Sequence, residues 1–270
     1  MGWGLRVGFV LVSSMTSALA ACSLLADSDG LSDHYGESTG DAATSGGDGA
    51  AGSSDGDGAA GSSDGEAPKP CSEKITKLLA CDDFDGTSAG VLSFSPRTDG
   101  AGSIEVTSAR AFSAPSSLHA VVGDVGGQGQ RFAKFSEARD EVAVTMKLFV
   151  AAPTSAPVRL LDLESASGKR LSLVLVGLNL AFAVGVPEDG GLDTKIYPST
   201  IDVSAGAWSP VNVDISDLNA TPNLYVGLGE RGPRVSASSK LAVATAIAIG
   251  AATSASAADI YLDDLVITER

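Results

Sequence analysis

The feature that most constrains the fold is a two-residue alternation of apolar and other side chains. Segment 141–151, EVAVTMKLFVA, places Val142, Val144, Met146 and Leu148 on one side, as in a β-strand with one buried face. Similar runs are GSIEVTS, SSLHAVVG, QRFAKFS, RLSLVLVG, LAFAVGV, WSPVNVDI, NLYVGLG, LAVATAIAIG and DIYLDDLVIT. Turn-forming segments such as DVGGQGQ, SASGK, PEDGG and SAGA separate them. We therefore predict an all-β fold, a two-sheet antiparallel β-sandwich or jelly roll. An immunoglobulin-like sandwich would need fewer strands.

The start of the chain has the pattern of an export signal. Arg6 precedes the run VGFVLVSSMTSALA, which is shorter than the roughly 20 apolar residues of a spanning helix. The end of this run and the two residues after it, Leu19-Ala20-Ala21-Cys22, resemble the lipobox of bacterial lipoproteins, which is cut just before the cysteine. The resemblance implies a signal peptide over 1–21 and a lipidated Cys22 carrying a diacylglyceryl thioether and a further acyl chain such as palmitate. It also implies a lipid bilayer as partner, in the cell envelope, and Ser23 favours the outer membrane. An ordinary export signal that contains a cysteine is the alternative.

Residues 22–69 read as a lipid-anchored disordered linker. Positions 27–66 hold ten acids and no Lys or Arg, and DGAAGSSDG occurs twice, at 48–56 and 57–65. Such a segment buries too little apolar surface to offset its ordering entropy. About 40 flexible residues give a mean reach on the order of 35 Å. The net charge of −15 is concentrated here, and no basic patch appears elsewhere, so we expect no nucleic-acid partner.

Two cysteines remain at the start of the predicted β-sandwich domain, 70–270. If Cys22 carries lipid, an exported compartment favours a disulfide between Cys71 and Cys81. Two free buried thiols are the alternative. The intervening SEKITKLLA predicts one or two helical turns.

Four motifs in the body occur in the order found in a known fold family. LLACDDFDG, AFSAPSSLHAVV, WSPVNVDI and the terminal IYLDDLVIT resemble concanavalin A-like lectin/glucanase jelly rolls over roughly residues 79–270. In that family the first and last strands lie side by side. The resemblance implies those places for Phe84 and for the 262–267 strand.

Acidic residues gather at both ends of the body. Asp82, Asp83 and Asp85 lie at the start, and Asp263 and Asp264 at the end. If the terminal strands pair, these carboxylates come close together, and calcium prefers such oxygen ligands. Related jelly rolls often carry a structural calcium, so we name these five residues as candidate calcium ligands. A solvated acidic rim is the alternative, because alternation turns half of the side chains outward and no D-x-D-x-D-G loop is present.

Catalytic residues are not predicted. Glucanases that resemble this fold place Glu-x-Asp-x-Glu on one strand, and the nearest approach here, DLES with Asp162 and Glu164, lacks the third acid. We expect those two residues to be surface salt-bridge partners rather than a glycosidase pair. His34 lies in the linker and His119 is the only histidine of the body, which excludes a zinc site of two or three histidines. Trp208 is expected to pack between the sheets.

The sequence thus predicts an envelope-anchored lipoprotein that displays a non-catalytic binding or structural module, with polysaccharide as a candidate ligand. We expect no cofactor other than the candidate calcium. The alternative is a glycan-degrading enzyme, a glycoside hydrolase or a polysaccharide lyase. The concave sheet discriminates between these functions: paired acids or Arg, Lys and Tyr in an open groove favour an enzyme, whereas Ala, Val and Leu filling it favour a structural role.

Overall fold

The structure, a computed structural model, describes residues 71, 74–188, 191–237, 240–253 and 255–270. These residues all lie in the second of two units into which the chain divides, 62–270. The predicted signal peptide, the Cys22 lipidation site and the linker lie outside the described residues. Within the described part, every regular element is a β-strand, and no helix is long and apolar enough to cross a bilayer.

Fourteen strands are defined in the described ranges. In chain order they are β1 (Leu78–Asp82), β2 (Ser88–Gly90), β3 (Ser95–Thr107), β4 (Ser117–Arg139), β5 (Val142–Val150), β6 (Val158–Ser165), β7 (Arg170–Val176), β8 (Asn179–Glu188), β9 (Gly191–Asp202), β10 (Trp208–Ser216), β11 (Asn223–Leu228), β12 (Arg234–Ser236), β13 (Ala244–Thr253) and β14 (Ala258–Thr268).

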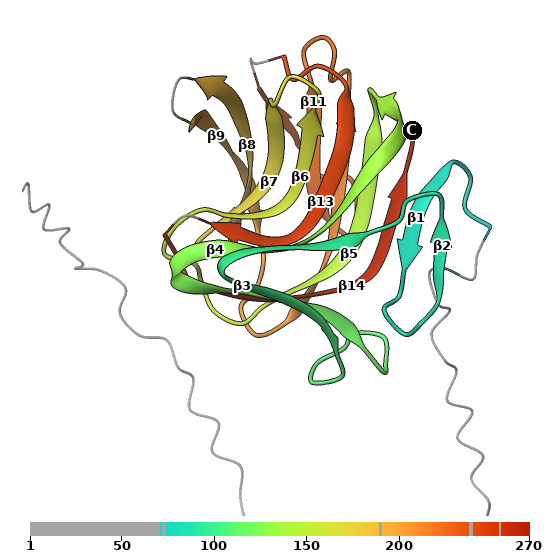
Figure 1. Cartoon of the computed structure of the whole chain (residues 1–270), viewed down its shortest axis with the longest axis vertical. Helices are drawn as coiled ribbons and strands as arrows, with labels where there is room; N and C mark the ends of the chain where they lie inside the picture. The colour runs from blue at the N-terminus through green and yellow to red at the C-terminus, as the bar shows by residue number, and fades with distance from the viewer. Residues whose placement is uncertain (1–70, 72–73, 189–190, 238–239, 254) are drawn as a thin grey trace, which may run out of the picture. The chain divides into compact units, whose positions relative to one another are not determined.

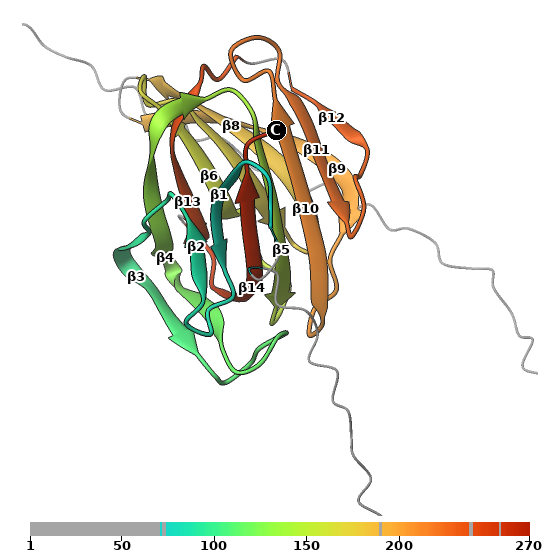
Figure 2. The same cartoon turned by 90° about the vertical axis from the view of Figure 1, so that its right-hand side faces the viewer.

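The strands form two layers that share one hydrogen-bonded path. Its order is β12-β11-β10-β5-β14-β4-β13-β6-β7-β8-β9, with β1 on β14, β2 on β1 and β3 on β4. Every strand pair is antiparallel, as the sequence predicts. Strands β6 to β9 and β13 form a curved layer (Figure 1). Figure 2 looks onto the other layer, which contains β5, β10, β11 and β14. In this view it lies in front of β6, β8 and β13 of the curved layer.

Strand β4 connects the layers because its two halves pair with different partners. Residues 118–122 pair with β14, whereas 127–139 pair with β13. The turn predicted at DVGGQGQ is therefore wrong, since this segment lies inside the strand and also pairs with β3. Its glycines permit close backbone contact with β3. A Cβ at Gly127 would lie 2.7 Å from the Asp99 carbonyl oxygen, and one at Gly129 would lie 2.1 Å from that of Ser103.

The two ends of the domain meet in one place. Strand β1 pairs with β14, with Cys81 opposite Val266, which confirms that the first and last strands lie side by side. The place expected for Phe84 is wrong, because β1 ends at Asp82 and Phe84 lies in the turn that follows. The predicted disulfide is also present, with the Cα atoms of Cys71 and Cys81 5.5 Å apart. The helical turns predicted within its loop are wrong where Leu78 begins β1. There, pairing with β14 and β2 overrides the local helical spacing.

The core lies between the two layers and follows the predicted alternation. In β5, Val142, Val144, Met146 and Leu148 are buried, and they join a single cluster with residues of β6, β7 and β8. Trp208 departs from the prediction. In β10 the buried series is Ser209 and the alternate residues after it, so the tryptophan lies on the outer face of the layer.

Candidate functional site

A groove of about 420 Å³ lies on the outer face of the curved layer, opposite the core. It crosses β6, β7, β8, β9 and β13. Val174 and Ala183, two of its small apolar lining residues, belong to a cluster separate from the main core. Two arginines, Arg159 and Arg170, are the charged residues of the lining, with Ser172 beside them. The groove therefore combines an apolar surface with two cationic side chains.

A β-bulge in β6 sets which side chains face this groove. Arg159 pairs with Val174 of β7, but the next pair is Leu161 with Leu173, so β6 carries one extra residue here. The extra residue reverses the alternation. Arg159 consequently lies on the same face as Asp162, with which it forms an ion pair at 3.1 Å. Strict two-residue alternation would have placed them on opposite faces.

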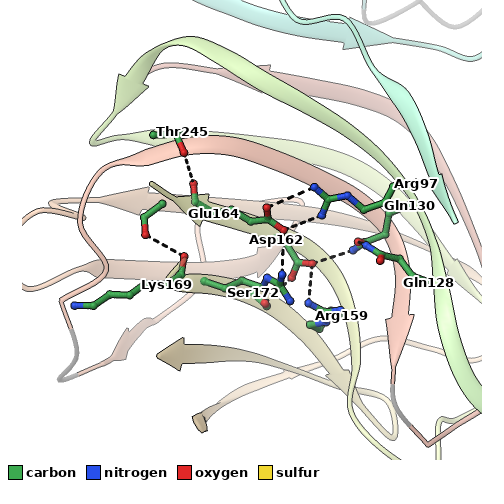
Figure 3. Close-up of polar contacts among 11 residues, drawn as sticks. Arg97, Gln128, Gln130, Arg159, Asp162, Glu164, Lys169, Ser172 and Thr245 are labelled. Carbon is green, nitrogen blue, oxygen red and sulfur yellow. Dashed lines mark hydrogen bonds and ion pairs between the residues drawn. The ribbon is translucent and has the colours of Figure 1, made fainter. Parts of the chain in front are cut away.

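Asp162 is the buried centre of a polar network that borders the groove (Figure 3). Its Oδ1 accepts a hydrogen bond from the Ser172 hydroxyl. Its Oδ2 accepts one from Gln130 Nε2 at 3.1 Å and also faces Arg159. The side-chain Nε2 of Gln128 in turn donates to the side-chain Oε1 of Gln130. Each carboxylate oxygen therefore has a donor, which compensates for the burial of the charge.

Glu164 forms the second half of the network. Arg97 Nη1 lies 2.8 Å from Glu164 Oε1, and Arg170 Nη2 lies 3.2 Å from the same oxygen. Arg97 also stacks on the ring of Phe132, 3.8 Å from its centroid. Burial alone would raise the pKa of Glu164, but the hydrogen bond from Arg97 and the charges of Arg97, Arg170 and Arg159 hold it below its ordinary value. Glu164 is therefore an ionised carboxylate at neutral pH.

The prediction of a salt-bridge role for the DLES acids is confirmed, but the prediction of a surface location is wrong for Asp162. That residue is fully buried, and the side chain of Glu164 is 22% exposed. The sequence did not identify the other members of the network, which come from β3, β4, β6 and β7: Arg97, Gln128, Gln130, Arg159, Arg170 and Ser172. Only the strand order brings them together.

The three acids at the end of β1 and in the turn after it have separate partners. Asp82 pairs with Arg131 at 3.0 Å, and burial raises its pKa despite that partner. Asp83 is fully buried; one oxygen accepts two amides of its own turn, and Oδ2 has no hydrogen-bond partner in the described chain. Asp85 accepts the backbone amide of Ser116 at 2.7 Å.

The two acids of β14 hold the loop at 108–116. Asp263 is fully buried, and its Oδ2 accepts the amides of Phe112 at 2.8 Å and Ser113 at 3.0 Å. Asp264 accepts the Ser113 hydroxyl at 2.7 Å. Burial raises the pKa of Asp263 to about 6, against the lowering effect of its backbone hydrogen bonds.

Of the five predicted calcium ligands, Asp85, Asp263 and Asp264 thus bond to the 108–116 loop, whereas Asp82 and Asp83 have other partners. Among the described residues, no three His, Cys, Asp or Glu side chains are grouped so as to hold a metal ion. Asp82, Asp263 and Asp264 already have protein partners, so a site built from all five carboxylates does not fit this arrangement. The unpartnered Asp83 oxygen beside Asp85 keeps a smaller calcium site, completed by carbonyls and water, as a prediction.

Aromatic rings gather on the outer face of the other layer, away from the groove. Trp208 lies 5.6 Å from Phe149, which meets Tyr261 edge-on, and Tyr261 stacks on His119 at 4.2 Å. His119 is partly buried and contacts Asp259 at 2.8 Å. The groove lining itself contains no aromatic residue within the described chain.

No protein-family model matches the chain, and a search of curated proteins finds no match. Solved structures are similar in fold. Cellulose induced protein Cip1 has a TM-score of 0.52 at 19% identity, over 70% of this chain and 97% of that chain. An endo-β-1,4-glucuronan lyase from the fungus Trichoderma reesei has a TM-score of 0.48 at 13% identity, over 65% and 90%. The binding domain of botulinum neurotoxin DC in complex with SialylT has a TM-score of 0.49 at 14% identity, over 71% and 47%. At such identities the likeness to Cip1 shows the fold alone: the domain is a jelly-roll β-sandwich.

Proposed function

We propose that this chain is an envelope-anchored lipoprotein whose β-sandwich binds polysaccharide in the groove of the curved layer without cleaving it. The observation that carries the proposal is the groove itself, about 420 Å³ in volume, with two arginines among mostly small side chains. An open groove of this volume admits sugar units. Its polar side chains supply directional hydrogen bonds, and its apolar lining suits the C–H faces of sugar rings.

A purely structural role is less well supported, because Ala, Val and Leu alone do not fill the groove. Arg159, Arg170 and Ser172 line it and connect to the network of Figure 3. Arg159 and Ser172 are held by the buried Asp162, and Arg170 contacts the partly exposed Glu164. A ligand would therefore lose little ordering entropy on contact with Arg159 and Ser172.

The state of the two acids supports binding over hydrolysis. A glycosidase needs a general acid that is protonated near neutral pH. The pKa of Glu164 is held below its ordinary value, and Asp162 is buried beneath three donors. Neither the carboxylate of Glu164 nor that of Asp162 is therefore suited to deliver a proton to a ligand in the groove.

A polysaccharide-cleaving enzyme remains the second candidate, and one observation favours it. Paired acids and arginines do occur beside an open groove, which is the pattern expected of an enzyme. Incubating the chain with each polysaccharide it binds, and measuring new reducing ends and unsaturated products, decides between the two. Turnover that Glu164→Gln abolishes would replace our proposal with the enzymatic one.

Binding is tested with a panel of insoluble and soluble polysaccharides, using a groove variant and a matched control. Ile196 lines the groove and is 39% exposed, whereas Leu228 on β11 is 41% exposed in the other layer. Ile196→Trp enlarges a side chain in the groove and is expected to weaken binding at least fivefold. Leu228→Trp makes the same kind of change elsewhere and should leave binding unchanged. Equal effects of the two variants would remove the groove from the proposal.

The anchor is tested separately in the native host. Because several acyl chains bind a bilayer far more durably than one, Cys22→Ala is expected to move the protein from the membrane fraction to the soluble fraction. Mass spectrometry of the mature chain should find an acyl-bearing Cys22 at its N-terminus. Retention of Cys22→Ala in the membrane fraction would contradict the lipoprotein assignment but not the groove assignment.

A further inference from the structure

We propose that the groove selects polysaccharides whose sugar units carry an oxyanion, a carboxylate or a sulfate ester, and that Arg170 binds this group. The inference rests on the proposed function, because it names the ligand class for the same groove.

The charge of the groove differs from that of the domain around it. From residue 67 onward the chain has 23 acids and 17 Lys or Arg. The groove lining, by contrast, contains two arginines and no acid among its described residues. In the network behind the lining, three guanidinium groups face two carboxylates. The groove is therefore a local cationic site on an acidic protein, and an anionic sugar unit would complement it.

Arg170 is the least committed of the three guanidinium groups. Arg97 donates two hydrogen bonds to Glu164 and stacks on the ring of Phe132. Arg159 is paired with the fully buried Asp162. Arg170 has one contact with Glu164, at 3.2 Å, and that carboxylate is shared with Arg97. One excess positive charge is thus centred on Arg170.

The donors of Arg170 point to the same class of ligand. A guanidinium group has five N–H donors in a planar fork. Arg170 Nε is buried and has no hydrogen-bond partner within the described chain, which is costly for a charged donor. Carboxylate and sulfate oxygens match the fork in pairs, whereas a neutral hydroxyl offers one oxygen. A modest rotation of the Arg170 side chain toward an oxyanion would therefore give Nε the acceptor that the protein does not supply.

Highly charged polymers fit the site less well than sparsely charged ones. The groove offers one excess charge beside the small apolar residues Val174, Ala183 and Ala252. The acidic domain would repel a dense polyanion such as a nucleic acid. The structure therefore favours an oxyanion set at intervals along an otherwise neutral sugar chain.

The test compares each acidic polymer with its own neutral form. The full chain in detergent is titrated against pectate, alginate and hyaluronan, each before and after carboxyl reduction, and against κ-carrageenan before and after desulfation. We expect at least tenfold tighter binding to one acidic polymer than to its neutral form. The carboxylate and sulfate arms then identify the source of the oxyanion.

Variants assign the preference to Arg170. Arg170→Gln should reduce the acidic-to-neutral ratio to within twofold, whereas Arg234→Gln on the exposed part of β12 should leave it intact. Because Arg170→Gln also disturbs the network, Ile196→Glu provides a second test. This residue is 39% exposed, so its replacement places a negative charge in the groove without opening the core, and it should also lower the ratio.

The outcomes separate the two proposals. Binding of both forms with equal affinity, or an unchanged ratio in Arg170→Gln and Ile196→Glu, overturns the oxyanion inference and leaves polysaccharide binding in place. Failure to bind any polymer, acidic or neutral, overturns the proposed function and this inference with it.

Discussion

Replacement of Asp162 tests the network that shapes the groove. Asp162→Ala removes the acceptor for the side chains of Gln130 and Ser172, which are 0% and 2% exposed. Each buried donor left without an acceptor costs about 1–3 kcal/mol. Arg159 is 27% exposed and can turn to water, so its lost ion pair adds less. We therefore expect Asp162→Ala to lower the free energy of unfolding by about 3–5 kcal/mol, the usual cost of breaking a buried pair.

Two further variants calibrate this value. Asp162→Asn keeps the shape and one acceptor oxygen, so it should cost about 1–2 kcal/mol. Glu164→Ala removes a carboxylate whose arginine partners are 25–30% exposed, and it should cost about 1 kcal/mol or less. The assay is equilibrium unfolding in urea at pH 7, with Cys22→Ala as the common background to remove the proposed lipid. If Asp162→Ala costs no more than Glu164→Ala, the buried network does not organise this part of the sheet.

Three other predictions follow from the remaining structure. Replacing Cys71 and Cys81 by serine should lower the free energy of unfolding by about 3 kcal/mol, because the bridge restricts the unfolded chain; equal urea midpoints with and without the bridge would contradict this. Because the pKa of Glu164 is lowered in the folded state, its stabilising effect is present above the unfolded pKa of about 4.3 and is lost as pH falls through the lower folded value. The stability difference between wild type and Glu164→Gln should therefore shrink between about pH 5 and pH 3, and a constant difference would count against the ion pairs. Calcium at about 100 times its Kd should stabilise the chain by about 2.7 kcal/mol if Asp83 and Asp85 bind it; an identical melting temperature in calcium and in EDTA would end the calcium prediction.

The strand pattern was predictable because each strand carries its own alternation. The residues of β5 that alternate as Val, Val, Met and Leu are buried as expected. Two errors have a common cause in tertiary contact. The helical spacing before Cys81 gives way to pairing with β14, and the glycines after Val122 continue a strand because β3 lies against them.

The groove was not predictable from local pattern. Its network joins Arg97, Gln130, Asp162 and Arg170 from four strands, and their order across the sheet depends on long-range pairing. The bulge in β6 adds a second obstacle, because it moves Arg159 to the face of Asp162. The position of Trp208 could not be predicted from its own strand. The alternation of β10 was clear, but the partner strands determine which face of β10 packs in the core.

The most direct test of the account is to locate a bound sugar chain on the protein. Amide chemical shifts of the chain, recorded during titration with an oligosaccharide of the tightest-binding polymer, report the contact surface residue by residue. The account predicts that the largest changes lie in β6, β7, β8 and β9 and centre on Arg170. Changes centred instead on the outer face of β5, β10 and β14, around Trp208, would contradict it.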